Sequence, residues 1–142
     1  MEVAPVLVGV DGSQESMRAL RWAARYARMS RAPLQVVMAW DLPRNYGMPA
    51  LYDDVDFAEQ TRARLAATLA AAGDLDVDVV AQQVEQGHPA AVLVGASDKA
   101  RLLVLGSHGH GGFTASLLGS VSQQCIQHAH CPVVVVRGRN EN

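Results

Sequence analysis

Five of the twelve glycines lie within residues 106–119, together with hydroxyl residues. Glycine allows the backbone to turn sharply and to approach a ligand closely. The N–H groups of such a loop, with those at the start of a following helix, form a cradle for phosphate oxygens. Residues 99–140 contain no Asp or Glu, so this segment brings no carboxylate that would repel a phosphate. The pattern predicts a phosphate-binding loop that contains Gly106, Gly109, Gly111, Gly112 and Gly119, with Ser120 and Ser122 as hydroxyl donors at the same end.

The glycine-rich segment also has a plainer interpretation, in which the glycines serve only tight turns. It differs from two common phosphate-binding motifs. The P-loop requires a Gly-Lys-Ser/Thr sequence, and this segment has no such lysine. The Rossmann fingerprint would follow the first strand, and no Gly-x-Gly-x-x-Gly stands there. The residues alone leave both interpretations open, and they do not identify a nucleotide.

The five histidines include two His-x-His pairs, His108 with His110 and His128 with His130. This spacing is compatible with a metal site. The first pair falls in the glycine-rich loop, and the second falls at the end of a helix, where it complements the helix dipole. We therefore favour the absence of a dedicated protein metal site.

Apolar runs alternate with amphipathic or alanine-rich segments along the whole chain. Continuous apolar runs bounded by turn residues are typical of buried parallel strands, and apolar residues recurring every three or four positions are typical of helices. Strands are predicted over residues 6–10, 34–40, 77–81, 102–105 and 133–136. Helices are predicted over residues 14–29, 55–72, 89–99 and 116–129, with Ser13 as the N-cap of the first and Pro89 near the start of the third.

Five strands that alternate with four helices predict an α/β fold, a single doubly wound domain with a five-stranded parallel sheet. The domain is expected to span residues 1–142, with a flexible tail over about 138–142 and a long loop over 41–54. The third strand is expected at an edge, because its polar residues alternate with apolar ones. Such sheets bind ligands at the carboxyl ends of the strands, where the strand order reverses. If the first and fourth strands flank that point, residues 11–13 and the glycine-rich loop line one crevice.

Composition excludes some classes of function. Charged residues make up 18% and the net charge is −2, whereas a nucleic-acid binder needs a basic excess. No apolar segment approaches the ~18 residues of a membrane span, and the N-terminus lacks the features of a signal peptide. Cys125 and Cys131 make no disulfide framework. We expect a cytoplasmic protein with reduced thiols and with neither nucleic-acid nor membrane partners.

The sequence closely resembles the universal stress proteins in several segments. Residues 8–13, Val-Gly-Val-Asp-Gly-Ser, are similar to the opening strand and loop of that family. Gly106, Gly109 and the pair Gly119-Ser120 match the spacing of the family's ATP-binding signature, Gly-x2-Gly-x9-Gly-Ser/Thr. Residues 119–136 also follow the family pattern, so the resemblance covers nearly the whole chain. The long signature separates the ATP-binding branch from the branch that lacks it.

The resemblance implies that the domain binds ATP, with Mg²⁺ carried by the nucleotide. It implies that the glycine-rich loop and the Val121 N–H hold the triphosphate, and that Ala39 offers backbone groups to adenine. Asp11 would lie near the ribose and would be the carboxylate for the metal ion, because Mg²⁺ usually binds phosphates plus one or two carboxylates. The implied nucleotide site consists of Gly9, Val10, Asp11, Ser13, Ala39, Gly106, Ser107, His108, Gly109, Gly119, Ser120, Val121 and Ser122.

The resemblance also implies a homodimer through the last strand, Val133 to Val136. An unpaired apolar edge strand is a hazard unless it is covered, so the physical argument agrees. No activated Ser-His-Asp set or pair of carboxylates accompanies the loop. We therefore expect a nucleotide-dependent stress-response switch with at most slow ATP hydrolysis. The alternative is a dimeric interaction module in the stress response that needs no nucleotide, and the downstream partner is unknown in either case.

The chain departs from the family pattern in two places. Gly9 stands where many members have proline, which matters mainly for local rigidity. His108 and His110 stand where arginine is common. Imidazoles near neutrality are weaker counter-charges than guanidinium groups, so we hypothesise a lower or more pH-dependent nucleotide affinity.

Overall fold

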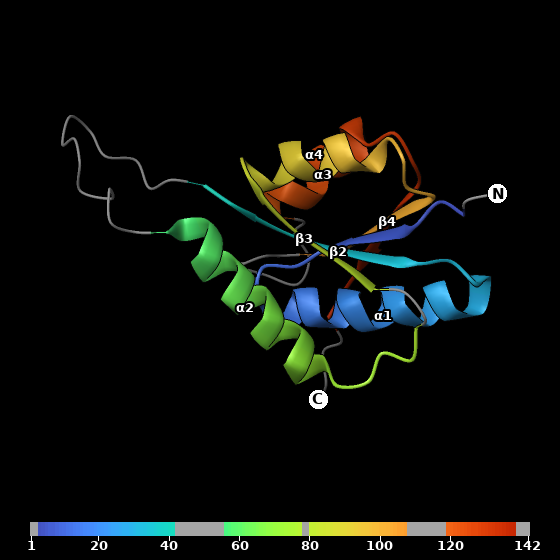
Figure 1. Ribbon diagram of the computed structural model, residues 1–142. Helices are drawn as coiled ribbons and strands as arrows, with labels where there is room; N and C mark the ends of the chain where they lie inside the picture. The colour runs from blue at the N-terminus through green and yellow to red at the C-terminus, as the bar shows by residue number, and fades with distance from the viewer. Residues whose placement is uncertain (1–2, 42–55, 78–79, 108–118, 139–142) are drawn as a thin grey trace.

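The computed structural model describes residues 3–41, 56–77, 80–107 and 119–138, which form one parallel sheet covered by helices on both faces (Figure 1). The five strands stand in the order β3-β2-β1-β4-β5. Their bounds are β1 Val6–Gly9, β2 Leu34–Trp40, β3 Val80–Gln86, β4 Leu102–Gly106 and β5 Val133–Val136. This is the doubly wound α/β sheet that the alternation of apolar runs predicts.

The central strands are buried on both faces, which explains why they are continuously apolar. In β1 all four residues are buried, and Val6 pairs with Leu34 of β2 on one side and Leu102 of β4 on the other. Val6 and Val8 point into the larger core, whereas Leu7 points into a second core on the opposite face. The two faces of β1 therefore fix the positions of two separate helix layers.

Helices α1 (Gln14–Ser30) and α2 (Phe57–Ala72) cover one face, and α3 (Pro89–Ser97) and α4 (Ser120–His128) cover the other (Figure 1). Side chains cap the first three helices, because Ser13, Asp56 and His88 each accept a hydrogen bond from a first-turn N–H group. Pro89 stands at the first position of α3, where its missing N–H costs no hydrogen bond. No described helix is both long and apolar enough to cross a bilayer.

The third strand was predicted in the wrong place. It runs over Val80–Gln86 rather than residues 77–81, because its backbone pairs with the whole of β2, from Leu34↔Val80 to Trp40↔Gln86. Asp76 has a positive φ of 54°, so the chain turns just before this strand. Its position at an edge of the sheet is confirmed.

The other predicted bounds differ from the structure by a few residues. β1 ends at Gly9 and not at Val10, although the Val10 N–H still donates to the carbonyl of Val37 at 2.9 Å. The second helix starts at Phe57, and the third ends at Ser97. The described part of α4 runs from Ser120 to His128. The predicted long loop beyond Asp41, the predicted start of α4 at residue 116 and the predicted tail beyond residue 138 lie outside the described residues.

Candidate functional site

The strand order reverses between β1 and β4, which are neighbours in the sheet. Successive connections run to one side from β1 to β2 and to the other side from β4 to β5. The carboxyl ends of β1 and β4 therefore flank the switch point, which is the position at which doubly wound sheets bind ligands. Residues 11–13 follow β1, whereas β4 ends at Gly106 and Ser107 follows it. The prediction that the first and fourth strands flank this point is confirmed, whereas the glycine-rich loop beyond Ser107 lies outside the described residues.

The segment after β1 is a tight turn that is stabilised by hydrogen bonds from its own side chains. The Ser13 N–H donates to Asp11 Oδ1 at 2.9 Å, and Gly12 supplies the positive φ of 86° that the turn requires. The Ser16 N–H donates to Ser13 Oγ at 3.1 Å, which makes Ser13 the N-cap of α1, as predicted. The Asp11 N–H donates to Ser16 Oγ at 3.2 Å, so Ser16 ties the turn to the helix. A role for Asp11 and Ser13 toward a nucleotide stays a prediction.

The start of α4 differs from the other helix starts because its N-cap is Gly119, which has no side chain to offer. The φ of Gly119 is −70°, an angle open to any residue, so backbone strain does not require glycine there. Ser120 is exposed and Val121 is half-buried in the first turn, where N–H groups lack intrahelical partners. Ser122 is buried, and its hydroxyl donates to the Gly119 carbonyl at 3.1 Å. Only some of the predicted hydroxyls therefore face outward.

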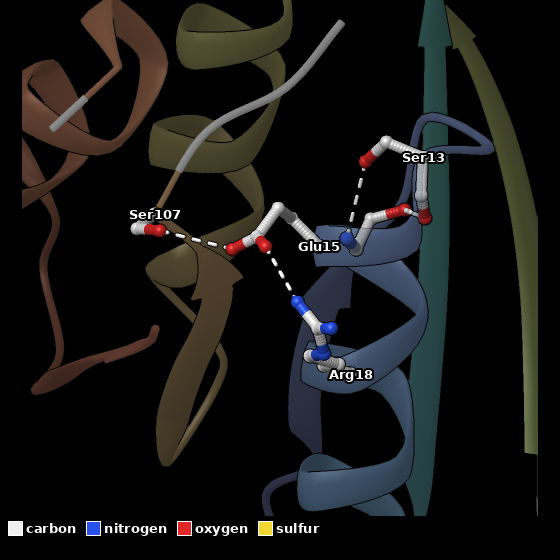
Figure 2. Close-up of polar contacts among 5 residues, drawn as sticks. Ser13, Glu15, Arg18 and Ser107 are labelled. Carbon is white, nitrogen blue, oxygen red and sulfur yellow. Dashed lines mark hydrogen bonds and ion pairs between the residues drawn. The ribbon is translucent and has the colours of Figure 1, made fainter. Parts of the chain in front are cut away.

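Ser107 is bound on several sides. Its N–H donates to the Val136 carbonyl at 3.1 Å, and its own carbonyl accepts from the Gly119 N–H at 2.7 Å and from Ser122 Oγ at 3.1 Å. Its hydroxyl donates to Glu15 Oε2 at 3.0 Å, and Glu15 in turn pairs with Arg18 (Figure 2). The Ser107 hydroxyl is thus directed at α1, which places this residue at the base of the loop.

Two of the predicted site glycines are packed against neighbouring elements. A Cβ at Gly106 would lie 2.9 Å from the backbone carbon and oxygen of Glu15, so the first turn of α1 needs glycine there. A Cβ at Gly9 would lie 2.8 Å from a methyl group of Leu93 on α3. Contact with backbone atoms therefore accounts for glycine at position 106 whether or not a ligand binds, whereas the atoms near Gly9 are side-chain methyl groups that can shift.

The remaining predicted residues lie around the carboxyl ends of β1 and β2. Val10 is buried in the core on the α1 face, and Ala39 is half-buried in β2, beside Glu85 of β3. Next to Ala39, the ring of Trp40 stacks on that of Phe57 with centroids 6.2 Å apart. His108 and Gly109 lie outside the described residues, as does His110, on which the hypothesis of pH dependence also rests.

Two functional candidates were missed in the sequence. Ser16 follows Ser13 at the spacing of a helix cap, which is a readable signal. Glu15 is an acidic residue in a first helical turn, where carboxylates are common for dipole reasons alone. The contact of Glu15 with Ser107 joins residues 92 positions apart, and no local sequence pattern predicts such a contact.

The two thiols are poor nucleophiles. Burial raises the pKa of the Cys125 thiol to about 11. Burial also raises the pKa of Cys131, against a backbone hydrogen bond involving Leu103 that lowers it. Thiolates are the reactive form, so neither cysteine is poised for nucleophilic chemistry near neutral pH. Among the described residues no three His, Cys, Asp or Glu side chains gather as a metal site.

Comparison with known proteins places this arrangement in a family. The model of the Universal stress protein family matches residues 3–137. A universal stress protein of Mycolicibacterium smegmatis is 41% identical over 138 residues, which cover 95% of this chain and 46% of the relative. The chain thus spans about half the length of this curated relative.

Solved structures give the same answer. A universal stress protein in complex with cAMP is 26% identical, with a TM-score of 0.74 over 96% of this chain and 98% of that one. The universal stress protein of Archaeoglobus fulgidus in complex with dAMP is 25% identical, with a TM-score of 0.63 over 96% of this chain and 100% of that one. With the sheet order, the turn after β1 and the glycine-capped α4 all in place, the chain belongs to the universal stress protein family.

Proposed function

We propose that this domain binds an adenine nucleotide, ATP with Mg²⁺, and acts as a nucleotide-dependent switch in the stress response. The observation that carries the proposal is the start of α4. Gly119 leaves the first-turn N–H groups without a capping side chain, at the end of the sheet where doubly wound folds bind ligands. The positive end of the helix dipole and these N–H groups favour an anion.

The phosphates would be held mainly by backbone N–H groups and hydroxyls. Ser120 is exposed in the first turn of α4, and the N–H of Val121 belongs to the same turn. The proposed phosphate site would be supported on its inner side by Gly106, Ser107 and Ser122, because the polar or packing contacts of these residues are directed into the protein. His108 and Gly109 would complete it from the loop.

The choice of an adenine nucleotide rests on the relatives, because the solved neighbours were bound to cAMP and dAMP. The choice of ATP rests on the spacing Gly-x2-Gly-x9-Gly-Ser, which is present without change. Ala39 would contact adenine at the end of β2, with Gly9 and Val10 beneath. Asp11 would approach the ribose and the Mg²⁺ ion, which favours carboxylate and phosphate oxygens. The described residues offer no activated nucleophile, so any hydrolysis would be slow.

Occupancy would be read out through assembly and partner contacts, as in other ligand-driven switches. The four valines of β5 are only half-buried in one chain, and β5 is an edge of the sheet. Pairing of this edge with a second copy would cover it. We place the working protein in the cytoplasm, with no nucleic-acid or membrane partner.

Gly119→Asp tests the proposal, because it separates the fold from the nucleotide. Aspartate is a good N-cap at the φ of −70°, so the stability of the variant should stay within a few tenths of a kcal/mol. Its carboxylate would occupy the N–H groups and repel phosphate. Gly119→Asn, a similar cap without charge, is the matched control. We expect isothermal titration calorimetry with ATP·Mg²⁺ to show binding by the unchanged protein and at least tenfold weaker binding by Gly119→Asp than by Gly119→Asn.

The position of β5 at an edge of the sheet favours one other function, that of a dimeric interaction module that needs no nucleotide. This alternative predicts no thermal shift with ATP, ADP, AMP or cyclic AMP, and no adenine absorbance in the purified protein. Equal affinities of the Gly119→Asp and Gly119→Asn variants for ATP, or no binding by the unchanged protein, would count against the nucleotide switch.

A further inference from the structure

Ser107 joins the two ends of the proposed phosphate loop. Its carbonyl accepts hydrogen bonds from the Gly119 N–H at 2.7 Å and from Ser122 Oγ at 3.1 Å, so β4 is bonded directly to the start of α4. Its N–H donates to the Val136 carbonyl of β5 at 3.1 Å. Ser107 is only 2% exposed. The orientation of Ser107 therefore sets where the first turn of α4 stands relative to the sheet.

Glu15 of α1 binds the side chain of Ser107. Helix α1 covers the face of the sheet opposite to the one that α4 covers. Glu15 Oε2 accepts from Ser107 Oγ at 3.0 Å, and Glu15 Oε1 accepts from an Arg18 guanidinium nitrogen at 2.7 Å (Figure 2). The Glu15 side chain is 23% exposed, so its charge is largely withdrawn from water and must be met by partners. A hydrogen bond to an ionised carboxylate is shorter and stronger than one between neutral groups.

The protein closes around this carboxylate on two sides. Gly106 lies against the backbone of Glu15, and Gly138 passes so close that a Cβ there would overlap the Glu15 carboxylate and the Arg18 guanidinium. The Glu15 carboxylate therefore lies between the end of β4 and the segment after β5. The Arg18 side chain stays 42% exposed, so the ion pair itself contributes little, and the hydrogen bond to the buried Ser107 is the contact that matters.

We propose that Glu15 is a positioning residue for the phosphate loop, acting through Ser107 without touching the nucleotide. The Glu15 carboxylate fixes the Ser107 hydroxyl, and Ser107 fixes the Gly119 N–H and the first turn of α4. The part that concerns nucleotide affinity rests on the proposed function, whereas the part that concerns the base of the loop does not. The Glu15 carboxylate, Ser107 and the Gly119 N–H thus form a chain of hydrogen bonds from the start of α1 to the start of α4.

The test uses Glu15→Ala, Ser107→Ala and the double variant. Ser107→Ala removes only the hydroxyl and keeps both backbone groups that bind β5 and α4. Glu59→Ala is the matched control, because Glu59 also lies in a first helical turn and pairs with an arginine three residues on, Arg62, at 3.1 Å on the exposed surface of α2. Two quantities are measured on each protein, the hydrogen-exchange rate of the Gly119 amide without nucleotide and the dissociation constant for ATP·Mg²⁺.

We expect Glu15→Ala to speed exchange at Gly119 and to weaken ATP binding, each by about tenfold, as befits one hydrogen bond to a charged group. Glu59→Ala should change neither, and the double variant should resemble Ser107→Ala because both substitutions break the same bond. Exchange at Gly119 that matches the Glu59→Ala control, or effects of Glu15→Ala and Ser107→Ala that simply add, would overturn the proposal. If the unchanged protein bound no nucleotide, the proposed function would fail, and the exchange rates would still decide whether Glu15 holds the base of the loop.

Discussion

Gly106→Ala is expected to destabilise the fold through packing, independently of any ligand. The added Cβ would meet the Glu15 carbonyl carbon and oxygen at 2.9 Å and the Glu15 Cβ at 3.0 Å. Carbon atoms in favourable contact stand about 3.5–4.0 Å apart, so the start of α1 would have to move by roughly half an ångström or more. These are mostly backbone atoms of a helix, which cannot swing aside as the end of a side chain can.

The magnitude follows from the cost of overpacking. Forcing a methyl group into a filled site typically costs about 1–3 kcal/mol of unfolding free energy. With a urea m-value near ~2 kcal/mol/M for a domain of this size, the midpoint of unfolding should fall by about 0.5–1.5 M. The m-value itself should not change, because the same surface is exposed on unfolding.

Gly95→Ala is the control for this experiment. Gly95 is an exposed residue of α3, and a Cβ there meets nothing within 4 Å. The same change of residue should therefore stabilise the protein by about 0.5–1 kcal/mol, through helix propensity. If Gly106→Ala unfolded at the urea concentration of the unchanged protein, or shifted in the same direction as Gly95→Ala, the close approach of α1 to β4 would be refuted.

The other predictions concern a helix cap, a buried thiol and an edge strand. Ser13→Ala removes the acceptor for the Ser16 N–H and should cost about 1 kcal/mol in chemical denaturation, and no change would show that the cap is dispensable. Burial raises the pKa of the Cys125 thiol to about 11, so this thiol ionises at a lower pH in the unfolded chain than in the folded protein. The contribution of the neutral, buried thiol to the free energy of unfolding should therefore be complete below about pH 8.5 and should be lost as the pH rises through 11. Comparing Cys125→Ala with the unchanged protein across that range checks this, and a constant stability difference would contradict it. The carbonyls of Pro132 and Val136 accept hydrogen bonds from the β4 side of the sheet, so the N–H of Val135, an odd number of residues away, points to the free side of β5. Proline has no N–H, so Val135→Pro should abolish the proposed dimer, as measured by sedimentation velocity. A dimer that persisted would place the interface elsewhere.

The arrangement of the sheet was predictable because each central strand has a continuous apolar sequence. The run at Val6 and the run at Leu102 are apolar throughout, and only strands buried on both faces need that composition. Alternation with helices then leaves few topologies, and the right-handed crossover rule selects among them. The third strand was misplaced because an edge strand with one wet face carries a weak pattern, and its pairing with β2 decides its bounds.

The candidate site was predictable at the level of segments but not of contacts. The alternation of strands and helices predicted that β1 and β4 flank the switch point of the sheet, as the strand order confirms. The tasks of individual glycines did not follow from their type, since Gly106 serves packing and Gly119 caps a helix at an ordinary φ. The partnership of Glu15 with Ser107 depends on how α1 is set against β4, which is a tertiary property with no local signature.

The two edges of the sheet differ in a way that limits assembly. β5 is a row of four valines, whereas β3 at the opposite edge carries Gln82, Glu85 and Gln86 at exposed positions. Polar and charged side chains on an edge discourage further strands from adding there. Pairing of one β5 with another uses the same edge twice about a two-fold axis, and such a contact is closed. In the proposed dimer the sheet would therefore grow in one direction only, and growth would stop after a single addition instead of continuing into a fibre.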